Sequence, residues 1–430
     1  MNLADLQAAW ARSDRLLSIL ADDAWLEQPI RLRQPFLFYL GHLPAFAWNQ
    51  LGRGWLGLPP FQPSFDALFE RGIDPVGVDA YVPLASWPER PAVLDYRDRV
   101  REALQSALGG DLPAQGNDVL AMVAEHEWMH QETLLYMVQE LDHCRKRRPA
   151  GWPELPRPRV TPPHRTVEVP DGEAVLGMPA GAAAFGWDNE FAECRVHVPA
   201  FRVDQHPVTN ADWREFVADG GYAEPRLWRE EDWRWRERRG LVRPHGWRTD
   251  EAAPAVRSLL ADVRFEVAAG WPVQVSWAEA CAYARWRGAR LPTEAEWQRA
   301  AYGTPHGGSR RWPWGDATPA TDRANLGFHR GSPLPVGSQP AGASAWGVFE
   351  MVGNGWEWTG TPFAPLPGFS PMPRYPGYSA DFFDGSHFVL LGGSWATEPL
   401  LLRPSFRNWF QPHYPFVFSK LRCVTTLTAV

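Results

Sequence analysis

A proline- and arginine-rich run, CRKRRPAGWPELPRPRVTPPHR, fills residues 144–165 and constrains the fold of this chain more than any other feature. Proline interrupts helices, and the run offers few apolar side chains for a hydrophobic core. The chain has 430 residues, which is more than a single core usually supports. We therefore predict a linker at residues 146–164, with one domain at residues 1–145 and a second at residues 165–430.

Residues 1–145 are predicted to be helical. In three stretches apolar side chains recur every three or four residues, the spacing of one helix face, and a fourth stretch is apolar almost all round. The predicted helices cover residues 3–20, 34–51, 92–108 and 117–144. Such a set indicates a four-helix bundle. The stretch from Gly52 to Pro91 is predicted to be a long loop, and loops of that length usually serve a function.

Residues 165–430 have a different pattern. Short stretches of alternating polarity are separated by glycine, proline and tryptophan, which predicts short strands joined by turns. Two segments have helical spacing, NADWREFVADG at residues 210–220 and SWAEACAYARWRG at residues 276–288. The predicted fold class is therefore multidomain, with an α domain followed by an irregular α+β domain.

The segment HEWMH at residues 126–130 carries the first chemical signal. Two histidines four residues apart lie on one face of an α-helix, so His126 and His130 can share one metal ion. Imidazole suits zinc, iron, copper and nickel, so the spacing leaves the metal open. The letters also fit the H-E-x-x-H pattern of zinc peptidases, in which Glu127 would be the general base. We disfavour that alternative because no third ligand follows in the same helix.

The totals exclude several classes of function. The net charge of -7 gives no general electrostatic reason to bind nucleic acid or an anionic membrane. No stretch of about eighteen apolar residues predicts a membrane span, and the first residues do not resemble a signal peptide. The four cysteines, at residues 144, 194, 281 and 423, form no C-x-x-C pair, which favours reduced thiols. We expect a cytoplasmic protein, and the sequence does not give its oligomeric state.

Several motifs of the second half occur together in one known family. HPVTNADWREFVADGGY, PVQVSWAEACAYARWRGARLPTEAEWQRAA, WPWGD, GVFEMVGNGWEWT and LLGGSWAT resemble the formylglycine-generating-enzyme-like (sulfatase-modifying factor) domain, a variant of the C-type-lectin fold. The first half resembles a DinB-type four-helix bundle. Bundle followed by such a domain is the architecture of the iron-dependent sulfoxide synthases of ergothioneine and ovothiol biosynthesis and of their relative, selenoneine synthase. Formylglycine generation itself is not expected, because GGSWATEP lacks the reactive cysteine of the members that perform it.

This resemblance implies a metal centre and a reaction. In the family three histidines bind iron, and YLGHLPAFAWN supplies His42 as the third ligand beside His126 and His130. A single histidine on an apolar helix is otherwise more often a core residue, and Pro44 is expected to kink that helix. The implied cofactor is Fe(II) and the implied co-substrate is O2. The implied reaction joins a chalcogen to carbon 2 of the imidazole of hercynine, which is trimethylhistidine.

The resemblance also implies substrate-binding residues. Asn408 and Trp409 match an Asn-Trp pair that binds hercynine, and an aromatic face is the natural partner of its trimethylammonium group. Tyr375 and Tyr378 occupy the region of a tyrosine that donates a proton or an electron, and the sequence does not choose between them. Arginines that hold the carboxylates of the donor correspond to Arg90 and Arg97 in PERPAVLDYRDRV.

Two positions depart from the ergothioneine pattern. Mycobacterial-type synthases have an acid after the Asn-Trp pair, where it meets the amino group of the donor, and this chain has Phe410. They also have glutamine before the last ligand histidine, where this chain has Met129. These departures favour a selenoneine synthase that takes a seleno-sugar, with Gln411 and His413 beside Phe410 to contact it. The alternatives are an ergothioneine-type synthase using cysteine or γ-glutamylcysteine, and an inactive lectin-like module that binds a betaine or a sugar.

Overall fold

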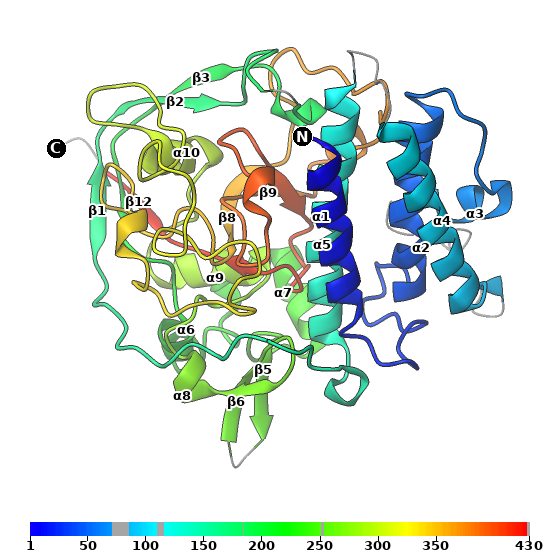
Figure 1. Cartoon of the computed structure of the whole chain (residues 1–430). Helices are drawn as coiled ribbons and strands as arrows, with labels where there is room; N and C mark the ends of the chain where they lie inside the picture. Colours follow the sequence, from blue (N-terminus) through cyan, green and yellow to red (C-terminus); the bar gives the residue numbers. More distant parts are fainter. Residues whose placement is uncertain (71–85, 110–115, 184, 251–252, 428–430) are drawn as a thin grey trace. The chain divides into compact units, whose positions relative to one another are not determined.

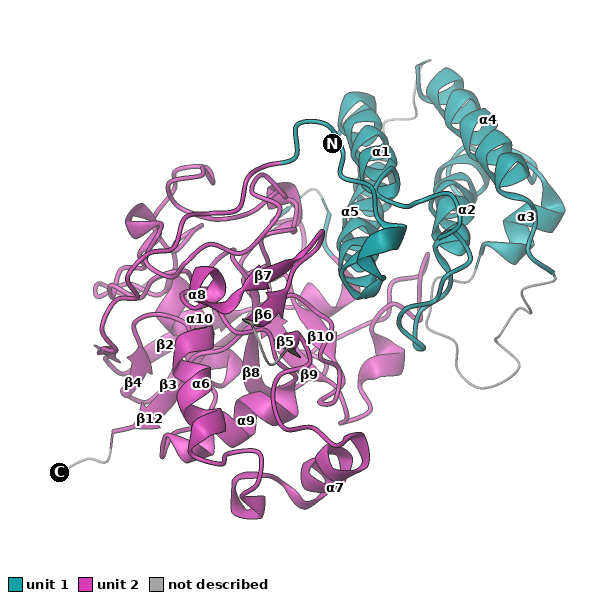
Figure 2. Ribbon diagram, turned by 90° about the horizontal axis from the view of Figure 1, so that it is seen from below, with its two compact units in different colours: residues 1–152, 183–186 teal, residues 153–182, 187–430 magenta. Residues whose placement is uncertain are grey.

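The structure is a computed structural model that describes residues 1–70, 86–109, 116–183, 185–250 and 253–427. The chain divides into two compact units, shown in Figure 2. Unit 1 comprises residues 1–152 and 183–186, and unit 2 comprises residues 153–182 and 187–430.

Unit 1 is a bundle of long helices. Its helices are α1 (Leu3–Leu17), α2 (Phe36–Ala47), α3 (Pro63–Leu68), α4 (Arg90–Leu108) and α5 (Asn117–Glu140), as labelled in Figure 1. Helix α1 packs against α5, and α2 packs against both α4 and α5. The predicted apolar stripe explains the first contact, because Leu6, Trp10 and Leu17 of α1 are buried. Four long helices therefore form where the apolar spacing predicts them.

The helix ends and the long loop differ from prediction. Helix α5 ends at Glu140 because Leu141 is extended, and a 3-10 turn at His143–Arg145 follows. The segment predicted to be a loop contains helix α3, which starts at Pro63, a residue that favours the first turn of a helix. Helix α2 continues past Pro44, and its geometry changes to a π-helix only at Trp48–Arg53. The kink predicted at Pro44 stays a prediction.

Unit 2 contains small sheets with helices around them (Figure 1). The first sheet is antiparallel, with β4 (Phe201–Asp204) between β1 (Thr166–Val169) and β12 (Val424–Thr426). The second has the order β10 (Asn408–Phe410), β9 (Phe388–Leu391), β8 (Trp356–Pro362) and β11 (Ser419–Lys420). Two smaller sheets pair β2 (Gly172–Leu176) with β3 (Cys194–Val198), and β6 (Ala253–Arg257) with β5 (Trp247–Asp250) and β7 (Asp262–Arg264).

Three of the longer helices of unit 2 begin at side-chain caps, and α7 does not. The longer helices are α6 (Asn210–Ala218), α7 (Glu230–Arg239), α9 (Trp277–Trp286) and α10 (Glu294–Tyr302), beside the one-turn α8 (Phe265–Ala268). Capping boxes start α6, α9 and α10, from Thr209, Ser276 and Thr293. Helices α6 and α9 match the two predicted segments. Helix α7 was missed, and α10 was not predicted as a helix although Thr293 and Glu296 form its capping box.

Ion pairs are buried in the core of unit 2. Arg422 of the last segment binds Glu357 of β8 through two hydrogen bonds, at 2.5 and 3.0 Å, and both side chains are fully buried. A buried charge needs such a partner, so this pair fixes the register between the C-terminal segment and the central sheet. All four cysteines are free. Among the described residues, no helix is long and apolar enough to cross a membrane.

Candidate metal and substrate site

Three histidines meet inside the bundle of unit 1. His42 extends from α2, and His126 and His130 extend from α5. One ring nitrogen of each lies within 4.8 Å of the others, and the Nε2 atoms of His42 and His126 are 3.3 Å apart. Nitrogens this close can converge on one cation. No other such group of histidine, cysteine or acidic side chains is found in the described part of the chain.

The hydrogen bonding of His42 prepares it to bind a metal. Its Nδ1 atom lies 2.7 Å from the backbone carbonyl oxygen of Phe69. A carbonyl oxygen only accepts hydrogen bonds, so Nδ1 must carry the proton and Nε2 keeps its lone pair. The Nδ1 atom of His130 is buried and has no hydrogen-bond partner among the described residues. A buried nitrogen without a partner is costly, and a metal ion would satisfy it.

The environment keeps all three rings neutral. Burial lowers the pKa of His42 to about 4, although its hydrogen bond to Phe69 opposes the shift. Burial also lowers the pKa of His126 well below its usual value, and the adjacent His130 and His42 lower it further. For His130 burial is again the main cause of a much lower pKa, followed by His42 and Arg33. Neutral imidazole is the form that binds metals, so these residues fit a divalent transition metal.

Aromatic rings line this cluster. The ring of Phe46 stacks on His126 with centroids 3.6 Å apart, and Phe38 stacks on His42 at 5.1 Å. Tyr39 lies beside His130 at 5.5 Å. All three aromatic residues belong to α2, which explains why its sequence is apolar almost all round. The rings exclude water from the histidines and hold their planes in place.

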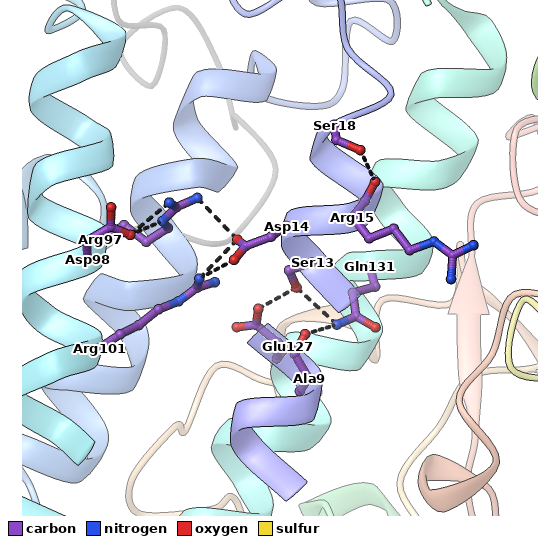
Figure 3. A network of polar contacts seen from close by, with 10 residues as sticks. All are labelled: Ala9, Ser13, Asp14, Arg15, Ser18, Arg97, Asp98, Arg101, Glu127 and Gln131. Atoms are coloured by element: carbon purple, nitrogen blue, oxygen red, sulfur yellow. Dashed lines mark hydrogen bonds and ion pairs between the residues drawn. The ribbon is translucent and has the colours of Figure 1, made fainter. Parts of the chain in front are cut away.

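Glu127 does not belong to the histidine cluster. It is one residue after His126, about 100° further round α5, and Figure 3 shows it pointing toward Ser13 of α1. Its carboxylate accepts a hydrogen bond from the Ser13 hydroxyl, which also accepts one from Gln131 at 3.0 Å. Glu127 therefore joins α5 to α1, and this position argues against a general base of a zinc peptidase.

We expect Glu127→Gln to retain its metal. Glutamine keeps an oxygen that can accept the hydrogen bond of Ser13, so metal content should match wild type and the unfolding temperature should stay within a few degrees. Metal analysis and thermal unfolding check this. If the wild type cleaved peptides in a metal-dependent reaction and Glu127→Gln abolished that cleavage, the chain would instead act as a zinc peptidase.

In unit 2, an aromatic cluster surrounds Trp409. Strand β10 pairs with β9, and the Trp409 ring stacks on Phe363 with centroids 4.1 Å apart. Phe382 and Tyr378 lie beside the ring, at 5.6 and 5.4 Å. The side-chain oxygen of Asn408 accepts a hydrogen bond from the backbone N–H of Trp409 at 2.9 Å. Asn408 and Trp409 are therefore held side by side, with several aromatic faces around the indole.

The two candidate tyrosines lie in one loop beside this cluster. Tyr378 stacks on Trp187 at 3.9 Å and meets Trp409 edge to face. Tyr375 lies 5.8 Å from Tyr378, and burial raises its pKa to about 12. Asp188 holds the loop, because its carboxylate accepts hydrogen bonds from the Ser379 hydroxyl and from the backbone N–H of Met372. Trp187 and Asp188 carry no sequence motif that links them to this loop, and they lie almost two hundred residues earlier in the chain.

Comparisons with known proteins identify both halves. The DinB superfamily model matches residues 5–134, and the model of the sulfatase-modifying factor enzyme 1-like domain matches residues 153–427. A Mycobacterium tuberculosis protein named hercynine oxygenase is 42% identical over 97% of this chain and 96% of its own. The chain belongs to the ergothioneine synthase family.

Two further relatives fit this placement. A hercynine oxygenase of Mycolicibacterium thermoresistibile is 38% identical, over 96% of this chain and 92% of its own. Ergothioneine biosynthesis protein 1 of Neurospora crassa is 31% identical over 99% of this chain, which spans only 58% of that protein. The resemblance inferred from the motifs is thereby confirmed, as are the DinB-type and sulfatase-modifying-factor-type halves of the fold.

The two arginines of unit 1 that were predicted to hold the carboxylates of the donor already have carboxylate partners in this chain. Arg90 binds Asp22 at 3.0 Å and lies over the ring of Trp25. Arg97 binds Asp14 at 3.1 Å, as Figure 3 shows. A substrate carboxylate would have to compete with these ion pairs. The assignment of Arg90 and Arg97 to an ergothioneine-type donor stays a prediction.

Met129 and Phe410, the two positions that depart from the ergothioneine synthase pattern, lie on separate elements. Met129 is half-buried on α5, directly before His130. Phe410 follows Trp409 in β10, so its side chain points to the opposite face of the strand, where it stacks on Tyr414 at 5.0 Å. His413 is held at 2.8 Å by Asp232.

Gln411 is the one predicted donor contact that the structure leaves exposed. The assignment of Phe410, Gln411 and His413 to the donor stays a prediction.

Proposed function

We propose that this chain is a non-haem iron(II), O2-dependent synthase that joins selenium or sulfur to carbon 2 of the hercynine imidazole. The observation that carries the proposal is the cluster of three neutral histidines in a chain 42% identical, over 97% of its length, to a protein named hercynine oxygenase. Imidazole suits iron as well as zinc, copper and nickel, and the family to which the chain belongs favours iron(II) among them.

The histidines would hold the metal without reducing its charge. His42, His126 and His130 are neutral donors, so a bound ion keeps its double positive charge. Iron(II) held there would supply redox chemistry with dioxygen and a charge that favours the anionic form of a thiol or selenol donor. The rings of Phe38 and Phe46 cover His42 and His126, and this apolar lining strengthens the electrostatic effect.

Trp409 and Asn408 would recognise hercynine. A trimethylammonium group has no N–H to donate, so an aromatic face is its natural partner. One face of the Trp409 indole stacks on Phe363, and the rings of Tyr378 and Phe382 border it. Asn408 adds a polar amide beside the indole. This pairing of aromatic and amide groups suits a ligand with a fixed positive charge and a polar remainder.

We expect Trp409→Ala to weaken hercynine binding. A cation over an aromatic ring contributes up to ~2 kcal/mol when desolvated, which is roughly thirtyfold in affinity. Calorimetric titration of the iron-loaded protein without oxygen measures the dissociation constant, and iron content should not change. Trp314→Ala is the control, because that ring stacks on Trp312 instead. An unchanged dissociation constant would remove Trp409 from the binding site.

A tyrosine of the loop held by Asp188 would serve as proton or electron donor. Burial raises the pKa of Tyr375 to about 12, so its hydroxyl stays protonated at neutral pH. Tyr378 contacts the Trp409 ring directly. Separate Tyr375→Phe and Tyr378→Phe variants distinguish the two, because only the variant that removes the donor should lower turnover while leaving hercynine affinity unchanged.

The proposed donor is a seleno-sugar, with cysteine and γ-glutamylcysteine as the ergothioneine-type alternatives. The departure that favours selenium is Phe410, which stands where mycobacterial-type members have an acid. With a thiol, one dioxygen, one C–H and one S–H would yield a sulfoxide and one water.

The deciding experiment incubates the iron-loaded protein aerobically with hercynine and each donor, and reads the product masses. A product that contains hercynine and the donor less two hydrogens supports the synthase, and the sulfoxide formed from a thiol carries one oxygen atom in addition. Hercynine binding without product from any donor would indicate an inactive binding module.

A further inference from the structure

The backbone carbonyl that contacts His42 belongs to a segment that no sequence motif marks. Residues 61–69 include helix α3, and Phe69 follows its last residue. The carbonyl oxygen of Phe69 lies 2.7 Å from Nδ1 of His42. The backbone N–H of Phe69 donates a hydrogen bond to the carbonyl oxygen of Phe65 at 2.9 Å. We propose that residues 61–69, anchored by Asp66, form the positioning element that fixes His42 as an Nε2 ligand. The proposal rests on the metal centre proposed above.

Asp66 anchors the segment from inside. Its buried carboxylate accepts hydrogen bonds from the backbone N–H groups of Phe61 and Gln62, at 2.8 and 3.1 Å. Its other oxygen accepts the hydroxyl of Tyr96, on α4, at 2.7 Å. Burial and this carboxylate raise the pKa of Tyr96, so the hydroxyl remains a donor. Three hydrogen bonds to one side chain tie the start of α3 to α4.

Gly41 fixes the same segment from the other side. A Cβ atom at Gly41 would lie 2.5 Å from ring carbons of Phe69, closer than carbon atoms approach. The bare backbone of α2 therefore lets the Phe69 ring lie against it, one residue before the ligand. The ring is also packed against Phe65, Tyr96 and Trp87. Both the ring and the anchor of the segment thus determine where the Phe69 carbonyl points.

The function of this arrangement is to orient a ligand. The hydrogen bond to Nδ1 selects the tautomer of His42, fixes the plane of its ring and makes Nε2 a stronger donor. Loss of such an outer partner typically lowers metal affinity about ten- to a hundredfold. Residues 61–69, which belong to the long loop predicted from the sequence, therefore orient His42.

The test uses three variants that disturb the segment from different sides. Asp66→Asn places an amide against backbone N–H donors, Tyr96→Phe removes one hydrogen bond, and Gly41→Ala displaces the Phe69 ring. Asp118→Asn is the control, because Asp118 is an exposed residue in the first turn of α5. Iron(II) affinity is measured by chelator competition. Nitrogen NMR of the metal-free protein reads which ring nitrogen of His42 carries the proton.

We expect Asp66→Asn and Gly41→Ala to lower iron affinity about ten- to a hundredfold, with a smaller loss for Tyr96→Phe and none for Asp118→Asn. The metal-free wild type should show His42 protonated at Nδ1, and the variants should show a mixture of tautomers. Wild-type affinity and a single Nδ1–H tautomer in all folded variants would overturn the inference. Absence of product with every donor would count against the proposed function alone, since the tautomer is read without metal or substrate.

Discussion

Replacing His126 with alanine is expected to leave the purified protein nearly free of iron. His126 is buried between His42 and His130, and its Nε2 atom lies 3.3 Å from that of His42. Structural metal sites with four ligands bind with roughly 10–16 kcal/mol, or about 3 kcal/mol for each ligand, so losing one should weaken binding more than a hundredfold. Within the described residues no fourth side chain of the kinds that bind metals completes the group.

The same result is expected for His42→Ala and His130→Ala. Each variant is reconstituted with iron(II) without oxygen, dialysed and analysed for metal, and circular dichroism verifies that the helices remain. The matched control is His306→Ala, because His306 is an exposed histidine of unit 2. Full metal content in any of the three folded variants would show that the histidine in question is not a ligand.

The metal site could be predicted in part from the sequence. The helical spacing of His126 and His130 is local, so the pattern alone predicts that they share a face. His42 lies on another helix, more than eighty residues earlier, and only the resemblance to a family connects it to them. Phe69 could not be found in this way. A backbone carbonyl carries no sequence signal, and its position depends on the fold of a segment that was predicted to be a loop.

The arrangement of unit 2 was harder to predict because its elements are short. Thr293 and Glu296 spell a capping box, yet helix α10 has only nine residues and its pattern is correspondingly weak. The Asp188 carboxylate meets Ser379 across 191 positions, which no periodicity predicts. Local pattern thus predicts which residues form an element, whereas long-range hydrogen bonds decide which loops meet.

The alternation of strand β10 bears on the two neighbouring residues Trp409 and Phe410. From the sequence, Trp409 was assigned to hercynine and Phe410 to the donor, and neighbouring residues of a strand point to opposite faces. The Trp409 ring lies among Phe363, Tyr378 and Phe382, whereas Phe410 stacks on Tyr414. A residue at position 410 therefore acts on a different part of the ligand, or on a different ligand, from the indole at 409.

The charge at position 410 is expected to decide the donor. Mycobacterial-type members have an acid there, and an α-ammonium group left without its counter-charge in a buried site costs several kcal/mol. One acid that the described residues place close to this segment is Asp232, and it already binds His413 and Arg229, at 2.8 and 2.6 Å. An amino-acid donor would thus lack a partner, whereas a seleno-sugar has no ammonium group to satisfy.

We expect the wild type to use a 1-seleno-sugar at least about tenfold better than γ-glutamylcysteine, a difference of ~1.4 kcal/mol in transition-state stabilisation. A selenol is also more acidic than a thiol, so more of it is anionic when it reaches the metal. The comparison is kcat/KM for each donor at saturating hercynine and oxygen. Preference for γ-glutamylcysteine by the wild type would place the chain in the ergothioneine branch.

Phe410→Asp should reverse that preference. The new carboxylate would pair with the α-ammonium group of γ-glutamylcysteine and replace the aromatic face that Phe410 shares with Tyr414. A reversal from tenfold one way to tenfold the other changes the ratio of the two kcat/KM values about a hundredfold, or ~2.7 kcal/mol. Phe410→Asn is the matched control, because it has the same shape as the aspartate and loses the same ring without adding a charge. If both variants shift the ratio equally, the lost ring and not the charge selects the donor.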